Sequence, residues 1–367
     1  MMAIHLPSLS SSSFRCVATT TLLLLLCILP HKCHGFGNLP QSVSDLFSQT
    51  KNNNNKKNSS KEEATTLLLK ELGVESSTEP KVFSAPMAQI PSLLIASLPA
   101  VLRLGSGIFA NGYQVSIVPK QKQPSSKYTV FSYGDYEIKE TCISPGRTTQ
   151  VQPLVLYEFE QCPFCRKVRE AISILGLTVT FQPCPPKGRL YRRDIKAQYG
   201  PSATFPFLQD PNTGIELFES DAIIDYLFRT YGSNGSTIPW TLTNPILVPL
   251  TAGLSLLLGG GGTVRNSNPP PPTTTNDNNL MELWSYEGSP FCKVVKERLC
   301  ELELAHTQIS CPRGSPNRQL LFDQTGGRFQ APYLRDPTTG IELFESQAIC
   351  EYLQKQYGVA DSPIKYL

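Results

Sequence analysis

The most constraining feature of this 367-residue chain is a sequence motif that occurs twice. Asp-Pro-x-Thr-Gly-Ile-Glu-Leu-Phe-Glu-Ser begins at Asp210 and again at Asp336, an offset of 126 (336 − 210). Upstream, Pro-Phe-Cys begins at Pro163 and at Pro290, an offset of 127 (290 − 163). Such a repeat means that one structural unit of about 80 residues is present twice, and a core of that size is only marginally stable. We therefore expect two small, related domains that pack on each other or on the segments before them.

Changes in composition divide the chain into a leader, two domains and their connections. The expected segments are a signal peptide (1–35), a transit-like segment (36–80), an apolar leader with a β-hairpin (81–151), the first domain (152–232), an apolar and then Pro/Asn-rich linker (233–279), the second domain (280–358) and a C-terminal tail (359–367). Four consecutive prolines from Pro269 favour an extended, disordered spacer in the linker.

The first 35 residues have the pattern of a secretory signal peptide. Arg15 precedes an apolar run from Val17 to Leu29, which is too short for a membrane span. Phe36 would begin the remaining chain, and a stretch rich in Ser, Asn and Lys follows. This arrangement resembles the two-part presequence of algae with secondary plastids, which implies a plastid location. The alternative is an ordinary secreted protein, for which Asn58 and Asn234 are candidate glycan sites.

Charge and cysteine content limit the classes of function open to the chain. The net charge of +3 favours neither a nucleic acid nor an acidic partner. Three of the eleven cysteines lie in the leader, and the other eight are too sparse for a disulfide-stapled secreted fold.

Ile246 to Val264 carries no charge, so peripheral membrane contact is one interpretation of this segment. Pro249 and the glycines at 259–262 disfavour a helix there, and a loop packed on a domain is the other interpretation.

Two features before the first domain predict local structure. Lys61 to Leu72 is consistent with a short amphipathic helix, either the end of the presequence or a mobile arm. Tyr128 to Cys142 alternates around a Tyr133-Gly134-Asp135 turn, which predicts a β-hairpin.

The first repeat predicts a β-α-β unit, a short helix, a hairpin and a final helix. The expected elements are a strand from Leu154 to Glu160, a helix from Pro163 to near Gly176, a strand over Thr178–Gln182, a helical stretch around Arg193–Tyr199, a hairpin over Pro206–Phe218 and a last helix capped by Ser220.

Cys162 is the candidate nucleophile, because it comes directly after the first strand and before the first helix. Pro163 suits the first helical position, which places Cys162 at the exposed cap. Free backbone N–H groups there favour a thiolate, and Arg166 and Lys167 add positive charge nearby. Cys165 is one turn further on, where a reversible disulfide with Cys162 is feasible. The alternatives are half of a zinc site or two buried thiols, but no second C-x-x-C and no H-x-x-x-H completes a metal cage.

The residues of the first repeat together resemble a known family. Cys-Pro-Phe-Cys after a strand, then Phe205-Pro206, then Glu219-Ser220, resembles a glutaredoxin or the N-terminal domain of a glutathione S-transferase. The pattern is also similar to the domain in type 2 prostaglandin E synthases, and to a plastid family of plants and algae that carries two such domains. The resemblance implies an α/β fold with two tandem thioredoxin-like domains joined by apolar and disordered linkers.

The same resemblance implies glutathione as the small-molecule ligand. Pro206 matches the cis-proline that faces the active cysteine, and the backbone of Phe205 would pair with the cysteinyl group of glutathione. A bulky Phe205 departs from the small or β-branched residue usual there. Glu219 and Ser220 match the motif that holds the γ-glutamyl end, where a helix N-terminus meets a carboxylate. The alternative is a strand-edge proline and an ordinary helix cap.

The second repeat predicts a degenerate copy of this site. Ser289 stands at the position of Cys162, and a serine is a poor nucleophile without a base. Its other members are Cys292, Ala331, Pro332, Glu345 and Ser346. Some transferases use a serine to activate the glutathione thiol, so activity of this copy remains an alternative.

Cys184 and Cys311 are candidate auxiliary thiols. The strands of a β-α-β unit are parallel, so residues just beyond their ends lie on one rim of the sheet. Cys184 would thus approach Cys162 and Cys165, and Cys311 would approach Cys292, as a second disulfide partner or a metal ligand. The alternative is a small buried residue between prolines.

The sequence therefore predicts a glutathione-dependent thiol–disulfide oxidoreductase that acts on protein thiols or disulfides, with a second domain that is degenerate. A conjugating transferase is less expected, because the helical domain that completes such enzymes does not follow either repeat. The alternatives are a non-catalytic scaffold that binds glutathione or a protein, attached to a thylakoid complex, and an iron–sulfur or metal-binding module.

Overall fold

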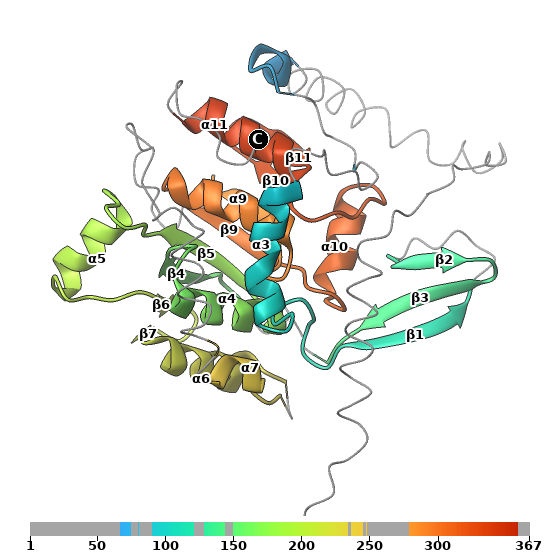
Figure 1. Cartoon of the computed structure of the whole chain (residues 1–367), viewed down its shortest axis with the longest axis horizontal. Coiled ribbons are helices and arrows are strands. Elements are labelled where there is room, and N and C mark those ends of the chain that lie inside the picture. The colour runs from blue at the N-terminus through green and yellow to red at the C-terminus, as the bar shows by residue number, and fades with distance from the viewer. Residues whose placement is uncertain are drawn as a thin grey trace, which may run out of the picture.

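The computed structural model describes residues 67–74, 80, 90–120, 128–143, 150–233, 236–244, 247 and 279–358 (Figure 1). The predicted signal peptide, the transit-like segment before residue 67, most of the linker, the C-terminal tail and both candidate glycan sites lie outside these residues. Within the described part of the chain, no helix combines the length and apolarity needed to cross a membrane.

Both repeats fold into the same succession of elements. The first consists of β4 (Leu154–Glu158), α4 (Pro163–Leu175), β5 (Thr178–Pro183), α5 (Tyr191–Tyr199), β6 (Phe207–Asp210), β7 (Ile215–Phe218) and α6 (Ser220–Tyr231), followed by the short α7 (Trp240–Thr243). The second consists of β8 (Met281–Ser285), α9 (Pro290–Glu301), β9 (His306–Ser310), α10 (Asn317–Gln324), β10 (Tyr333–Asp336), β11 (Ile341–Phe344) and α11 (Ser346–Tyr357).

Strand pairing in each repeat is that of a thioredoxin-like unit. β4 pairs parallel with β5 and antiparallel with β6, which pairs antiparallel with β7. The second repeat has the same pattern, with β8 between β9 and β10. The predicted α/β fold with two tandem thioredoxin-like domains is confirmed.

The two domains share one continuous sheet. Its order is β11-β10-β8-β9-β5-β4-β6-β7, because β5 pairs antiparallel with β9. Figure 1 shows the strands of both domains forming this sheet through the centre of the molecule. Backbone hydrogen bonds between two otherwise open strand edges thus satisfy both edges at the junction.

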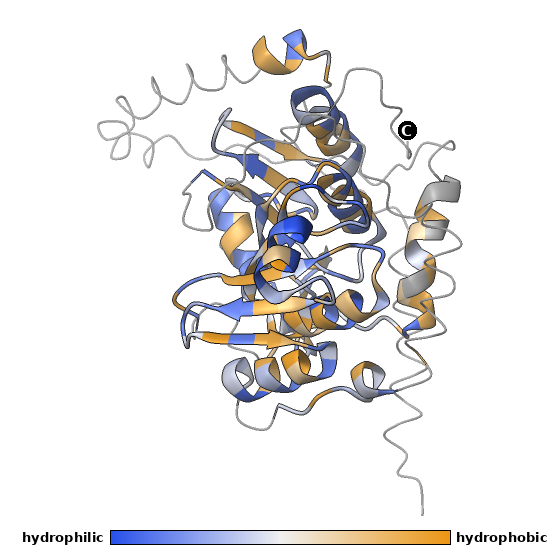
Figure 2. Ribbon diagram, turned by 90° about the vertical axis from the view of Figure 1, so that its left-hand side faces the viewer, coloured by the Kyte–Doolittle hydropathy of each residue, from blue (hydrophilic) through white to orange (hydrophobic). Residues whose placement is uncertain are grey.

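Each domain has its own core, built as the apolar spacing predicts. In α4, Val168, Ile172 and Leu175 are buried against β4 and α6. Gly176 ends this helix in the left-handed conformation at φ 66°, as glycine commonly does. Figure 2 shows polar and apolar residues alternating along both the strands and the flanking helices.

Part of the leader completes the core of the second domain. Residues 67–71 are helical, and Leu69 and Val74 are buried among side chains of α9 and α11. The described part of the predicted Lys61–Leu72 helix is therefore a packed element and not a mobile arm. The apolar stretch after residue 90 forms α3 (Ile90–Leu102), which packs on α9.

A small separate sheet precedes the first domain. It consists of β1 (Gln114–Pro119), β2 (Phe131–Tyr133) and β3 (Tyr136–Thr141) in the order β1-β3-β2. The hairpin predicted around Gly134 is confirmed, whereas β1 was not predicted. Figure 1 shows this sheet beside α10, at the opposite side of the molecule from α5.

Candidate functional site

The N-terminus of α4 positions Cys162, the residue that the sequence singles out. Cys162 is the N-cap, with an extended backbone (φ −73°, ψ 123°) and Pro163 in the first turn, so the predicted helix start is confirmed. Its Sγ accepts a hydrogen bond from the backbone N–H of Cys165 at 3.3 Å. The turn after β4 fixes the cap, because the Cys162 N–H donates to the carbonyl oxygen of Phe159 at 3.0 Å.

The two cysteines of this turn have opposite acidities. The hydrogen bond with the Cys165 thiol lowers the pKa of Cys162, and backbone N–H groups of Cys165 and Phe164 lower it further, against the effect of burial. Burial, and then the hydrogen bond with Cys162, raise the pKa of Cys165 well above its ordinary value. Cys162 is therefore the thiol that ionises first, which is the property of an attacking thiol.

The prediction that Cys162 is exposed is wrong. The residue is only 5 % exposed, because the chain around Phe205 covers it and the Phe205 carbonyl oxygen lies 3.9 Å from its Sγ. Phe205 is in turn held by Arg192, whose guanidinium carbon lies 4.6 Å from the ring centroid. The nearby Phe164 is half exposed, so the thiol lies just beneath the protein surface.

The positive charge expected near Cys162 is also compensated. Arg166 is buried, and it forms ion pairs with Glu170 at 3.1 Å and with Glu287 at 3.7 Å. Lys167 forms an ion pair with Asp221 at 2.5 Å. Both cations of the prediction are thus paired with carboxylates, so the positive charge that they add near Cys162 is largely compensated.

Two residues that the sequence places beside the cysteine lie there in the structure. The Phe205–Pro206 and Ala331–Pro332 peptide bonds are both cis, as predicted for Pro206. The carbonyl group of Phe205 faces Cys162 across the start of β6. The backbone at Phe205 is therefore positioned to contact a group bound at the thiol.

The Glu219-Ser220 motif has an unusual backbone. Glu219 is the N-cap of α6, at φ 68° and without a side-chain cap, and Ser220 is the first helical residue, so the prediction that Ser220 caps the helix is wrong by one position. Glu345 repeats the same conformation before Ser346, at φ 67°. A left-handed glutamate costs about 1–3 kcal/mol, and such strain concentrates at ligand sites. Its occurrence in both domains supports a binding role for this turn.

The second domain keeps this geometry without the sulfur. Ser289 is the N-cap of α9, and its Oγ accepts the N–H of Cys292 at 3.3 Å. Burial raises the pKa of Cys292. A Cβ atom on Gly288 would overlap Ile108, so the leader lies directly against this turn. The described arrangement offers Ser289 neither a base nor an open approach.

Cys184 and Cys311 lie at the predicted rim, and their role as auxiliary thiols stays a prediction. The N–H of Cys184 donates to the carbonyl oxygen of Glu158 at 2.6 Å, which confirms that the two strand ends are adjacent. Both sulfurs are fully buried, and burial raises the pKa of both thiols. The eight cysteines in the described residues are free, and those residues contain no cluster of three His, Cys, Asp or Glu side chains able to hold a metal. The simpler interpretation, a small buried residue between prolines, fits Cys184.

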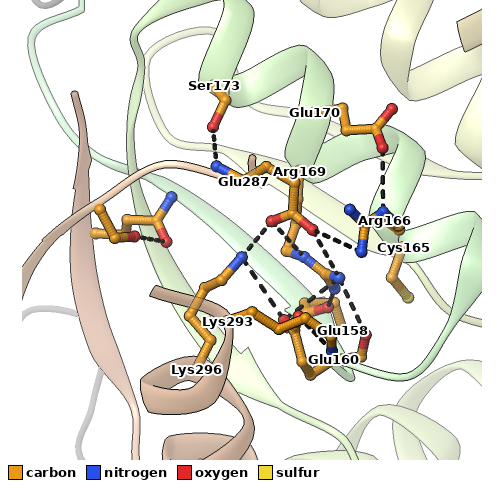
Figure 3. Close-up of polar contacts among 12 residues, drawn as sticks. Glu158, Glu160, Cys165, Arg166, Arg169, Glu170, Ser173, Glu287, Lys293 and Lys296 are labelled. Atoms are coloured by element: carbon orange, nitrogen blue, oxygen red, sulfur yellow. Dashed lines mark hydrogen bonds and ion pairs between the residues drawn. The ribbon is translucent and has the colours of Figure 1, made fainter. Parts of the chain in front are cut away.

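The sequence did not predict the buried ionic cluster at the domain junction (Figure 3). Arg169 lies at its centre and forms ion pairs with Glu158, with Glu160 at 3.3 Å and with Glu287 at 3.1 Å. Lys296 forms ion pairs with Glu287 and with Glu160 at 3.8 Å. All five side chains are buried. Their mutual ion pairs offset the free-energy cost of removing these charges from water.

The cluster is built from equivalent positions of the two repeats. The pairs Glu160/Glu287, Arg166/Lys293, Arg169/Lys296 and Glu170/Glu297 each differ by 127 residues. This recurrence is a signal in the sequence that could have identified the cluster. Charged residues that occupy the same positions in both repeats are consistent with a contact between the two domains. Arg103, just after α3, extends the cluster through Glu170 at 2.5 Å.

Glu158 connects the cluster to the cysteines. Burial, with a further contribution from Glu160, raises the pKa of Glu158 to about 7, against the effect of Arg169. Its charge in turn raises the pKa of both Cys162 and Cys165. A carboxyl group that changes charge near neutral pH therefore lies behind the thiol pair.

Comparison with known proteins agrees with this geometry. A family model described as "Glutathione S-transferase, N-terminal domain" matches residues 156–235 and again 283–361. The two matches coincide with the two thioredoxin-like units. The chain therefore contains two domains of the glutathione S-transferase N-terminal type, which is the part of the expected resemblance that is established.

Two individual proteins are similar over parts of the chain. "Glutathione S-transferase-like protein OpS6" of Beauveria bassiana (strain ARSEF 2860) is 36% identical over 91 residues, which cover 23% of this chain and 38% of the relative. The chain thus matches less than half of that relative's length. A trimeric glutathione transferase of Leishmania, TDR1, aligns over 57% of this chain and 70% of its own at 15% identity, with a TM-score of 0.19.

Proposed function

We propose that this protein is a glutathione-dependent thiol–disulfide oxidoreductase with Cys162 as its nucleophile. The observation that carries the proposal is the N-cap geometry of Cys162, with its lowered pKa, next to the Phe205 carbonyl group and the cis peptide bond at Pro206. The strained turn at Glu219 supplies the second contact for glutathione.

The reaction balances without any further oxidant. The Cys162 thiolate attacks the glutathione sulfur of a protein–glutathione mixed disulfide, forms an enzyme–glutathione disulfide and releases the protein thiolate, which takes up a proton. A second glutathione thiolate then attacks the glutathione sulfur of that disulfide, which restores the Cys162 thiolate and releases oxidised glutathione. Cys165 can replace that second glutathione by attacking the Cys162 sulfur, which forms an intramolecular disulfide and releases the bound glutathione as a thiolate that takes up a proton. Two further glutathione thiols then reduce the Cys162–Cys165 disulfide and leave as oxidised glutathione.

Cysteine variants of the protein test this proposal. We expect Cys162→Ser to lose turnover of a small glutathione mixed disulfide by more than about a hundredfold, because serine is a far weaker nucleophile. Cys165→Ser should retain that turnover and lose the reduction of protein disulfides. Cys142→Ser, in a half-buried cysteine outside both sites, is the matched control. Unchanged turnover in Cys162→Ser contradicts the proposal.

A non-catalytic scaffold that binds glutathione is the second candidate. Two observations favour it: Cys162 is almost fully covered, and the second domain keeps the same turn with Ser289 in place of the sulfur. It predicts that immobilised glutathione retains wild-type protein and Cys162→Ser equally, while neither turns over a mixed disulfide.

We also propose a plastid location, which rests on the leader sequence alone. Arg15, the apolar run from Val17 to Leu29 and the Ser/Asn/Lys-rich stretch after Phe36 support it. A fluorescent protein fused after residue 80 should accumulate in plastids, and secretion of that fusion contradicts this location.

A further inference from the structure

We propose that the surface around Arg192 binds an acidic, aromatic segment of the protein substrate, in the position that the leader occupies on the second domain. This inference rests on the proposed oxidoreductase function and names the substrate class of the same site. The observation behind it is that one chain presents the same arginine twice, buried in the second domain and only half-buried in the first.

Arg192 and Arg318 are structural equivalents. The Nε of Arg192 donates to the carbonyl oxygen of Cys184 at 3.0 Å, and that of Arg318 donates to the carbonyl oxygen of Cys311 at 3.2 Å. Each guanidinium group also lies over the ring of an equivalent aromatic residue, Phe159 in the first domain at 5.3 Å and Tyr286 in the second at 5.5 Å. The two arginines therefore present their outer edges to equivalent surfaces.

In the second domain, residues of the small sheet and its neighbours cover this arginine. The Tyr128 hydroxyl accepts a hydrogen bond from Nη1 of Arg318 at 2.7 Å, and the guanidinium group lies over the Tyr128 ring at 5.7 Å. The buried carboxylate of Glu140, in β3, lies 4.0 Å from Arg318 and forms an ion pair with Arg313 at 2.5 Å. An aromatic ring and a carboxylate from the same chain thus occupy the site.

In the first domain, no described segment covers the corresponding surface in this way. Among the described residues, the terminal nitrogens of Arg192 have no hydrogen-bond or ion-pair partner. Lys187, Arg189 and Arg193 of the same segment are exposed. Of these, Arg193 forms an ion pair with Asp194. Figure 1 shows α5 on the far side of the molecule from β1–β3. An incoming carboxylate therefore meets a surface on which basic side chains outnumber acidic ones.

The groups behind this surface leave that charge in place. Glu303 of the second domain is buried behind the loop, where its carboxylate accepts the backbone N–H groups of Arg189 at 2.9 Å and Leu190 at 3.1 Å. It anchors the loop backbone, and the basic side chains remain outside. Glu303 of the second domain thus holds the loop of the first domain in place, with the basic side chains of that loop directed outward.

The backbone explains why one occupant is permanent and the other is not. On the second domain, the Arg313 N–H donates to the carbonyl oxygen of Ile108 at 2.8 Å, and the Ala110 N–H donates to the carbonyl oxygen of Arg313 at 2.9 Å. The offset between the repeats changes from 127 at Cys184/Cys311 to 126 at Arg192/Arg318, so Arg313 corresponds to Pro186 or Lys187. Among the described residues, neither of these two forms a backbone hydrogen bond with another segment. A partner there is held by charge and ring contacts, so its binding is reversible and weakens as salt rises.

This surface adjoins the thiol. The guanidinium group of Arg192 lies 4.6 Å from the Phe205 ring centroid, and the Phe205 carbonyl oxygen lies 3.9 Å from the Sγ of Cys162. A substrate segment bound at Arg192 therefore holds a neighbouring glutathionylated cysteine beside the group that covers Cys162.

The test compares two glutathionylated peptides with the full chain. One carries two aspartates and a tyrosine beside its cysteine, and the other carries two lysines and a leucine. At low salt we expect a kcat/KM about tenfold higher for the acidic peptide, a preference that 0.5 M salt removes. The double variant Arg189→Gln/Arg193→Gln, which leaves Arg192 in place, should reduce the preference by about three- to tenfold while turnover of a small neutral mixed disulfide stays unchanged.

A matched control and a binding assay keep the two proposals separable. Arg229→Gln removes one exposed charge on α6 that is paired with Asp225, and it should leave the preference unchanged. If no mixed disulfide is turned over, the proposed activity fails; salt-sensitive binding of the acidic peptide to Cys162→Ser, weakened in the double variant, still supports the docking surface. Equal binding of both peptides, or a variant effect on the KM of glutathione alone, overturns it.

Discussion

Thr180 and Thr307 face each other at the junction of the two domains, with their hydroxyl oxygens 3.2 Å apart. They are directly paired in the register of β5 and β9, and they are equivalent residues of the two repeats (307 − 180 = 127). Pairing of a residue with its own equivalent places a local twofold axis between them. Side chains near this axis therefore meet their equivalents, which is why Glu160 and Glu287 come to share the same cations.

Removal of the central cation should destabilise the junction. Arg169→Met leaves the carboxylates of Glu158, Glu160 and Glu287 buried without their shared guanidinium group, and we expect a loss of about 3–5 kcal/mol of unfolding free energy. Urea denaturation measures it. Arg229→Met, which breaks an exposed ion pair, is the control and should cost less than about 1 kcal/mol. Equal losses in the two variants would contradict a structural role for the cluster.

Glu158 should make stability fall as pH rises. Burial, with Glu160, raises its folded-state pKa from 4.5 to about 7. Below pH 4.5 both states are protonated, so its contribution to stability is fully present there; between 4.5 and about 7 the unfolded state loses its proton first, and that contribution is lost. Glu158→Gln removes this dependence, so its Tm should increase relative to wild type from pH 5 to pH 8. Parallel Tm curves would show that the carboxyl group does not titrate in this range.

Contact between the leader and the second domain can be tested at one glycine. Gly288→Ala places a methyl group where Ile108 lies, so we expect a cost of about 1–3 kcal/mol and faster amide hydrogen exchange at Ala110 and Arg313, whose backbones pair. Gln161→Ala, at the equivalent position of the first domain, is the control. Unaltered exchange at Ala110 in Gly288→Ala would mean that the leader does not lie on this turn.

Local signals made much of the fold predictable. The apolar spacing after Pro163 identified α4, and the Asp-Pro-x-Thr-Gly turn identified each hairpin, because these patterns act within a few residues. The aspartate of the same motif also has a structural role that was not predicted. Asp210 accepts hydrogen bonds from the hydroxyls of Tyr226 and Tyr231, and Asp336 accepts them from the equivalent tyrosines of α11.

What remained unpredicted depends on contacts between distant residues. Nothing near β5 or β9 specifies that their edges pair, yet that pairing determines what surrounds Arg169 and Arg166. In a sequence, the ion-pair partners of a charged helix position cannot be seen, so Arg166 was expected only to add positive charge near the thiol. The cover over Cys162 likewise comes from Phe205, which is 43 residues away.

The state of the Cys162 sulfur is the most direct test of the account. Alkylation of the folded protein by iodoacetamide, followed residue by residue with mass spectrometry from pH 5 to pH 10, reports both its ionisation and its access to reagent. We expect Cys162 to react first, with a midpoint below the ordinary cysteine pKa of about 8.5, while Cys165 reacts only after unfolding in urea. A Cys162 that stays unmodified until the protein unfolds, or a midpoint at or above 8.5, would contradict its role as the nucleophile.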